Sequence, residues 1–319
     1  MEKIEFIPEQ MTVSALCLGS GSFGAEVSEA DAFRQIDCFL DAGGSFIDTA
    51  RIYGAWMGRG EGLSETTLGH YFMQTGRRHE LAISTKGGHP LWGTAKPRLQ
   101  PRELAEDVKQ SLQALKTDYI DLYYLHRDNP ELPVEEILTA LEALRSTGLI
   151  RHYACSNWAL PRLKEAQAAA QKLGYIGFSA NQLMWSLADI NQAAVDWDLC
   201  AMNAETYTYQ QQQQLPVMAY SSLAHGYWVK RQQGLPIKET FQRLYQTPVT
   251  DQLYQLLTNE LPEGYSVLDI SLLYFSRRPF PAVPIAAFRS EEQLKQALAA
   301  MEKPYPEAFM QKIHSIKPY

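Results

Sequence analysis

Residues 120–156 read IDLYYLHRDNPELPVEEILTALEALRSTGLIRHYACS, and this stretch contains the unit from which the chain is built. The apolar run Ile120–Leu125 predicts a buried strand, and His152–Ser156 predicts another. Between them, from about Val134, the amphipathic pattern predicts a helix. A strand, a crossover helix and a second strand form the parallel unit of α/β proteins.

The same alternation occurs eight times along the chain. The other predicted strands are Ala15–Leu18, Ser45–Asp48, Leu81–Lys86, Ser179–Gln182, Val217–Tyr220 and Pro281–Val283, and the other predicted helices begin near Ser28, Leu63, Arg102, Leu160, Asn191, Val267 and Glu291. Eight units in 319 residues predict a single domain over residues 1–319, a closed (β/α)8 TIM barrel. Lys3–Met11 predicts an additional N-terminal hairpin. Tyr227–Thr247 is too long for an ordinary βα loop and is interpreted as a lid.

Composition argues against several classes of protein. The net charge is −7, and aromatic residues are not interleaved with clusters of Lys and Arg, which disfavours a nucleic-acid surface. No apolar run approaches the roughly 18 residues of a membrane span, and the first residues do not resemble a signal peptide. Four scattered cysteines without a C-x-x-C pair are typical of a reducing compartment. We therefore expect a cytoplasmic protein.

A glycine motif follows the first predicted barrel strand. Residues Gly19–Gly24 read GSGSFG, which matches the G-x-G-x-x-G dinucleotide fingerprint, and Asp41 follows at about the required spacing. In that fingerprint the helix opens directly at the glycines, so that its N-terminus meets the pyrophosphate. Here Ser28 is the better candidate for the helix N-cap. The motif is therefore interpreted as a loop at the mouth of a barrel.

Polar and ionisable side chains follow six consecutive predicted strands. They are Asp48, Tyr53, Lys86, His126, Ser156, Asn157, Gln182, Tyr220 and Ser221. Because the carboxyl ends of barrel strands meet at one mouth, these side chains predict an active site there. A Lys86 ammonium would lower the pKa of Tyr53, and Asp48 would keep Lys86 charged. Neutral His126 would orient a carbonyl oxygen while Tyr53 donates a proton to it. Each residue alone has a plain structural alternative, such as a loop cap or a core histidine.

Several ordered stretches resemble one enzyme family. They are FIDTARIYG (46–54), ISTKGG (83–88), LKTDYIDLYYLHRDNP (115–130), GLIRHYACSN (148–157), NQLMWS (181–186) and VMAYSSLAHG (217–226). From roughly Ala15 to Met301 the chain resembles the aldo-keto reductases. The resemblance implies a catalytic tetrad of Asp48, Tyr53, Lys86 and His126. It implies NADP(H), with NAD(H) not excluded, held by residues Gly19, Ser20, Ser156, Asn157, Gln182, Tyr220, Ser221 and Leu223.

In the family, the residues that bind the 2′-phosphate follow the last strand, and in that segment this sequence resembles the family less. Arg289 offers a planar donor for a phosphate, and it could equally be an ordinary surface residue. Gln293 stands at a polar contact position of the family, and Ala297 replaces the Asn expected at the adenine.

Aromatic residues follow several strand ends and are interpreted as the substrate pocket. They are Phe23, Trp56, Trp92, Trp158, Trp185 and Trp228. Such a rim is typical of a pocket for an apolar or planar substrate. The alternative is ordinary packing of the loops against the barrel, because each Trp buries a large area.

Two functions remain open at this point. The first is reduction of aldehydes and ketones, or the reverse oxidation of alcohols or sugars. The second is a cofactor-binding regulatory subunit on the same scaffold, like the channel-associated members of the family. The sequence contains no His-rich cluster with metal-ligand spacing, so no metal site is expected. The substrate, its preferred direction of turnover and the oligomeric state stay open.

Overall fold

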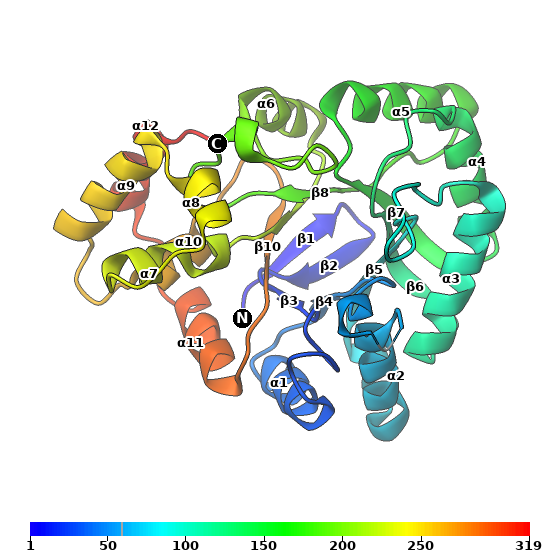
Figure 1. The fold of residues 1–319 in the computed structure, drawn as a ribbon, viewed down its shortest axis with the longest axis horizontal. Helices are drawn as coiled ribbons and strands as arrows, with labels where there is room; N and C mark the ends of the chain where they lie inside the picture. Colours follow the sequence, from blue (N-terminus) through cyan, green and yellow to red (C-terminus); the bar gives the residue numbers. More distant parts are fainter. Residues whose placement is uncertain (59) are drawn as a thin grey trace.

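The computed structural model describes residues 1–58 and 60–319, in which eight parallel strands close into a barrel (Figure 1). The barrel strands are β3 (Cys17–Gly19), β4 (Phe46–Asp48), β5 (Ala82–Gly87), β6 (Ile120–Leu125), β7 (Ile150–Ser156), β8 (Asn181–Met184), β9 (Val217–Tyr220) and β10 (Ala282–Ala286). Because β10 pairs with both β9 and β3, the ring has no free edge. The predicted (β/α)8 barrel is confirmed.

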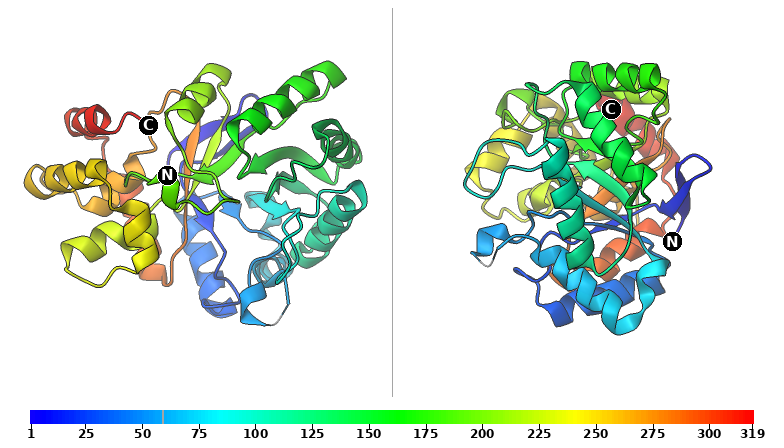
Figure 2. Two further views of the ribbon diagram at one scale, coloured as in Figure 1. Left: turned by 45° about the horizontal axis from the view of Figure 1, so that its top comes forward. Right: turned by 90° about the vertical axis from the view of Figure 1, so that its right-hand side faces the viewer.

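Helices connect successive strands and cover the outside of the barrel (Figure 2). They are α1 (Glu29–Asp41), α2 (Leu63–Thr75), α3 (Pro101–Leu115), α4 (Val134–Ser146), α5 (Leu160–Leu173), α6 (Ala204–Gln213), α10 (Val267–Leu273) and α11 (Glu291–Met301). Ser28 caps α1 as predicted, and Ser290 caps α11; each accepts a hydrogen bond from the third residue of its helix. Within the described residues, no helix has the length and apolarity needed to cross a membrane.

An N-terminal hairpin covers the end of the barrel at which the strands begin. Its strands are β1 (Lys3–Ile7) and β2 (Met11–Ser14), which pair antiparallel. Phe6 and Val13 are fully buried against residues of the barrel interior, including Phe46 and Leu122. The hairpin therefore closes this end, and the opposite end remains as the mouth (Figure 1).

The predicted helix near Asn191 is wrong. Asn191 does cap a turn, but that turn is the single 3-10 segment η3 (Gln192–Ala194). The helix between β8 and β9 is α6, which begins after Asn203, whose side chain accepts a hydrogen bond from Thr206 N. The predicted start thus coincides with the cap of a short turn, but the helix that continues toward the next strand begins at a second cap.

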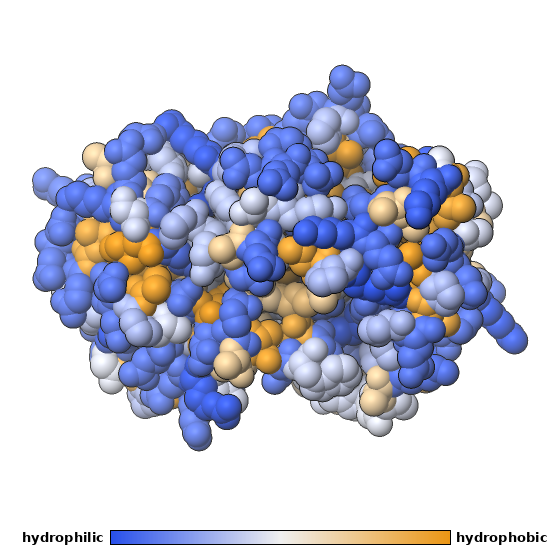
Figure 3. All heavy atoms as spheres, turned by 90° about the horizontal axis from the view of Figure 1, so that it is seen from above, coloured by the Kyte–Doolittle hydropathy of each residue, from blue (hydrophilic) through white to orange (hydrophobic). Residues whose placement is uncertain are grey.

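The segment Tyr227–Thr247 is helical and packed. It contains α7 (Tyr227–Gln232) and α8 (Glu239–Tyr245), and its Trp228 and Tyr245 are buried in a second apolar cluster. Two helices that the sequence did not predict, α9 (Pro248–Asn259) and α12 (Glu307–Ile316), pack against each other beside this segment (Figures 1 and 2). Its role as a lid stays a prediction. On the face shown in Figure 3, polar residues predominate and apolar residues form small separate groups.

Candidate active site

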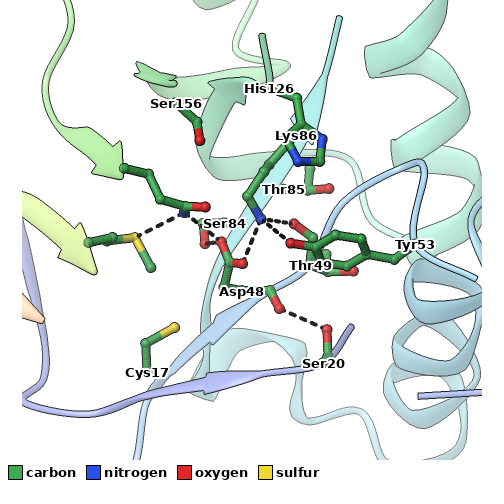
Figure 4. A network of polar contacts seen from close by, with 12 residues as sticks. Cys17, Ser20, Asp48, Thr49, Tyr53, Ser84, Thr85, Lys86, His126 and Ser156 are labelled. Carbon is green, nitrogen blue, oxygen red and sulfur yellow. Dashed lines mark hydrogen bonds and ion pairs between the residues drawn. The ribbon is translucent and has the colours of Figure 1, made fainter. Parts of the chain in front are cut away.

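Three adjacent strands place three ionisable side chains at the mouth of the barrel (Figure 4). Asp48 is the last residue of β4, Lys86 lies near the end of β5, and His126 follows β6 directly. These strands are neighbours in the barrel. Tyr53 lies in the turn that follows β4 and points back toward Lys86. The structure thus brings the four predicted catalytic residues together.

Asp48 and Lys86 form a buried ion pair. Lys86 Nζ lies 2.6 Å from Asp48 Oδ2, and the two side chains are 1% and 3% exposed. The other carboxylate oxygen, Asp48 Oδ1, accepts hydrogen bonds from Ser84 Oγ at 2.7 Å and from Gln182 Nε2 at 3.0 Å. A buried pair is stable only when its remaining hydrogen-bonding positions are filled, as they are here.

Lys86 fixes the position of the Tyr53 hydroxyl. Besides Asp48, Lys86 Nζ donates to Thr49 O at 2.7 Å and to Tyr53 Oη at 3.1 Å. An ammonium has three donors, so all three are used. Because Tyr53 Oη accepts from Lys86, its own hydrogen is free to be donated elsewhere.

The pKa values of this pair are set by burial and charge. Burial lowers the pKa of Lys86, but Asp48 and Tyr53 together raise it by a larger amount. The pKa of Lys86 therefore lies above its ordinary value. For Tyr53, burial raises the pKa, and this rise exceeds the lowering caused by Lys86. The expected net lowering of the Tyr53 pKa is therefore corrected. Desolvation of the phenolate outweighs the favourable charge, and Tyr53 retains its proton at neutral pH.

His126 is neutral and faces the same space. Burial, and then the charge on Lys86, holds its pKa well below the ordinary value. Its ring centroid lies 6.0 Å from that of Tyr53, and the edge of the His89 ring packs against it at 4.8 Å. Among the described residues, His126 Nδ1 has no hydrogen-bond partner.

Residues after β7 and β9 form a second set of polar contacts. Asn157, in the left-handed region with φ 60°, accepts from Tyr220 Oη at 2.7 Å and from Cys200 N at 3.0 Å. Asn157 Nδ2 donates to Ser156 Oγ at 3.1 Å. The amide of Asn157 thus orients both Ser156 and the ring of Tyr220. Cys200 was not predicted to take part, because its contribution is a backbone N–H, which is independent of residue type.

A cavity of about 260 Å³ opens beside Tyr53. It is lined by Gly19, Gly21, Asp48, Tyr53, Tyr220, Ser221, Ser222, Leu223, His225, Ile285, Ala286 and Ala287. A Cβ added at Gly21 would lie 3.6 Å from the Tyr53 ring, so a side chain there would enter this space. Within the described part of the chain, the backbone N–H groups of Ser222 and Leu223 have no acceptor. Free backbone N–H groups at the wall of a cavity are groups that can bind an anion such as a phosphate.

The glycine motif borders this cavity and does not open a helix. Gly19 ends β3, whereas α1 begins at Glu29 after the Ser28 cap. Ser20 is buried and donates from Oγ to Asp48 O at 2.8 Å. The interpretation of Gly19–Gly24 as a loop at the barrel mouth agrees with this geometry.

The residues expected at the 2′-phosphate lie at the start of α11. Arg289 and Gln293 are exposed, and Arg289 N donates to Gln293 Oε1 at 3.0 Å. Ala297 is fully buried in the core. Two acidic residues, Glu291 and Glu292, occupy the first turn of the helix. Arg289 is thus the only cation in the segment 287–293.

The aromatic residues expected at the substrate pocket divide into two groups. Phe23, Trp158, Trp185 and Trp228 are buried in the apolar clusters, as the packing alternative requires. Trp56 and Trp92 are exposed on the loops after β4 and β5, where substrate contact stays a prediction. Trp197, which was not singled out from the sequence, is 89% exposed on the loop between β8 and α6.

Comparison with known proteins agrees with this geometry. The model of the Aldo/keto reductase family matches residues 15–318. This chain belongs to that family. It is 29% identical to the uncharacterized oxidoreductase YrpG of Bacillus subtilis (strain 168), over 97% of this chain and 93% of the relative. It is 30% identical to a probable voltage-gated potassium channel subunit beta of Arabidopsis thaliana, over 52% of this chain and 50% of that one.

A solved structure extends the comparison to the fold. The holo form of aldo-keto reductase AKR11C1 from Bacillus halodurans is similar to this chain with a TM-score of 0.75 and 25% identity. The match covers 99% of this chain and 96% of that one. As a member of the aldo/keto reductase family with oxidoreductase relatives, this chain is an NAD(P)H-dependent oxidoreductase that acts on carbonyl groups.

The buried ion pair yields a stability prediction. We expect Asp48→Asn and Lys86→Met each to lower the free energy of unfolding by about 3–5 kcal/mol, because each leaves one buried charge without its partner. The double variant should lose less than the sum of the two. Urea unfolding at neutral pH measures all three. Equivalent changes at the exposed pair Lys312–Glu260 should each cost below about 1 kcal/mol. Additive losses at Asp48 and Lys86 would contradict the coupling.

Proposed function

We propose that this aldo/keto reductase reduces aldehydes and ketones with NADPH in the cytoplasm, with Tyr53 as general acid, and that the same site oxidises alcohols in reverse. The observation that carries this proposal is the arrangement at Lys86. The three donors of Lys86 bind Asp48, Thr49 and Tyr53. The hydroxyl hydrogen of Tyr53 therefore points away from Lys86 and can be donated to a substrate. A carbonyl oxygen at this point would meet the Tyr53 hydroxyl and the neutral ring of His126.

Two polar groups near β7 and β8 have unused hydrogen-bonding capacity that would suit a nicotinamide carboxamide. A carboxamide needs a donor for its oxygen and an acceptor for its NH₂ group. Ser156 Oγ accepts from Asn157 but keeps its own hydrogen to donate. Gln182 Nε2 donates to Asp48 Oδ1, and among the described residues no hydrogen bond reaches Gln182 Oε1. Ser156 and Gln182 would thus bind the group directly, with Asn157 and Tyr220 held in position around it.

The roles of the chain's own residues follow from these contacts. A reduced nicotinamide bound in the cavity beside Tyr53 would supply the hydride. Tyr53 would donate its proton to the substrate oxygen, and Lys86 would stabilise the resulting phenolate through the hydrogen bond it already makes. His126 would orient the oxygen with its ring N–H. Asp48 would hold Lys86 charged throughout.

Replacement of Tyr53 tests the proposal. Tyr53→Phe removes the proton donor and little else, so we expect reduction of an aromatic aldehyde to slow by about 10²–10⁴-fold. The dissociation constant for NADPH should change little. Consumption of NADPH reports the rate, and quenching of protein fluorescence reports binding. Loss of binding together with activity would show that Tyr53 is structural. Wild-type protein that binds NADPH but reduces no carbonyl would support the regulatory alternative instead.

The pKa shifts predict a flat pH profile. Tyr53 acts in its protonated form, and its pKa is raised above 10.0, so the acid form persists well above neutrality. His126 acts in its neutral form, and its pKa is lowered well below 6.5, so the neutral form persists below that value. The single-turnover rate of reduction should therefore be constant between pH 6.5 and pH 10.0, the ordinary pKa values of His and Tyr. A fall in this rate below a midpoint near pH 6.5, seen also in His89→Phe, would contradict the assignment of His126 as neutral.

The preference for NADPH depends on Arg289. A guanidinium that binds the 2′-phosphate makes charge-assisted hydrogen bonds, and their loss typically costs about 1.5–3 kcal/mol. Arg289→Ala should therefore raise KM for NADPH by about 10–100-fold and leave KM for NADH nearly unchanged. Lys295→Ala removes one positive charge from α11, the helix that follows Arg289, and is the matched control. An equal effect of Arg289→Ala on both cofactors would place Arg289 outside the phosphate site.

A further inference from the structure

Arg127 is a charged residue at the mouth that has no role in the reaction described above. It directly follows His126 at the end of β6. Its Nη1 donates to His126 O at 2.9 Å, and its Nε lies 2.7 Å from Asp198 Oδ2. Only 15% of the Arg127 side chain is exposed. The third nitrogen, Nη2, has no acceptor among the described residues, and it is not among their buried polar atoms that lack a partner. Arg127 Nη2 therefore keeps some exposed surface and a free donor.

The positive charge of Arg127 reaches the reacting groups. Burial raises the pKa of Tyr53 and of Tyr220, and the charge of Arg127 opposes both rises. Burial and Lys86 lower the pKa of His126, and Arg127 lowers it further. The contacts place the guanidinium near these rings: His126 O accepts from Arg127 Nη1 and from Asn157 Nδ2, and Asn157 Oδ1 accepts from Tyr220 Oη. Lys86, by contrast, has all three of its donors occupied and cannot bind a second anion.

The partner of Arg127 is well placed to be exchanged. Asp198 is 35% exposed and belongs to the long loop between β8 and α6, beside the almost fully exposed Trp197. Asp198 can be solvated by water when it leaves Arg127, whereas the mostly buried guanidinium then needs another anion. A carboxylate on a substrate could share or replace this contact at little cost, and it would match the planar fork of a guanidinium.

We propose that Arg127 forms an anion subsite beside His126, so that the preferred substrates are aldehydes or ketones that carry a carboxylate. This inference rests on the proposed function. Asp198 neutralises Arg127 in the absence of substrate and competes with the substrate carboxylate. The alternative is that the pair only fastens the β8–α6 loop to β6. The two readings predict opposite effects when Asp198 loses its charge.

The test compares para-carboxybenzaldehyde with its neutral methyl ester. The quantity measured is the ratio of kcat/KM for the acid to kcat/KM for the ester. In Arg127→Gln we expect this ratio to fall by about 10–100-fold, through loss of a charge-assisted hydrogen bond. In Asp198→Asn the ratio should rise severalfold, because the competing carboxylate is gone. Arg145→Gln, which breaks the remote pair with Glu142 on α4, is the matched control and should leave the ratio unchanged.

Binding of benzoate to the NADPH complex provides a readout without turnover. Weaker binding in Arg127→Gln and tighter binding in Asp198→Asn support the subsite, even if neither aldehyde is reduced and the proposed function fails. Turnover of both aldehydes with the same ratio in wild type and Arg127→Gln would overturn the subsite and leave the proposed function standing. A loss in Asp198→Asn that affects acid and ester equally would show that the pair only fastens the loop.

Discussion

The contact between Asp48 and Lys86 constrains the rest of the mouth. Removing two charges from water costs several kcal/mol per ion unless every remaining donor and acceptor is filled. The barrel fills them from four directions: Ser84 from β5, Gln182 from β8, the Thr49 carbonyl and the Tyr53 hydroxyl. Tyr53 is therefore held in place by the same requirement that keeps Lys86 charged. The position of the Tyr53 hydroxyl follows from satisfying a buried ammonium.

The same burial also sets the limits of the chemistry. Lys86 favours the phenolate of Tyr53, yet the pKa of Tyr53 is raised because its oxygen is desolvated. A donor of this kind does not ionise before a substrate arrives. In the proposed reaction, Lys86 would contribute when negative charge develops on the Tyr53 oxygen as the proton leaves. Stabilisation that appears only as the reaction proceeds is the kind that accelerates it.

Periodicity predicted the barrel because each strand–helix unit repeats one pattern, and the topology of parallel units leaves few alternatives. It also predicted Asp48, Lys86 and His126 as neighbours, because adjacent strands end at one mouth. Position in the sequence did not distinguish exposed from buried aromatic residues, because burial depends on what packs around each side chain. Trp158 and Trp185 follow strand ends as Trp92 follows β5, but only Trp92 lies outside the core. Nor did the sequence reveal Cys200, whose contact is made by the backbone.

Two ion pairs at the mouth differ in a way that suits different tasks. Asp48 and Lys86 are buried with all the Lys86 donors occupied, so neither can exchange its partner without a large cost. Arg127 and Asp198 are partly solvated, and the guanidinium keeps one nitrogen unoccupied among the described contacts. A buried pair with no free donor, such as Asp48 and Lys86, suits a site that must hold one hydroxyl in a fixed position. A site that must accept and release a charged ligand needs the second kind of pair, because its own carboxylate can hold the cation until the ligand arrives.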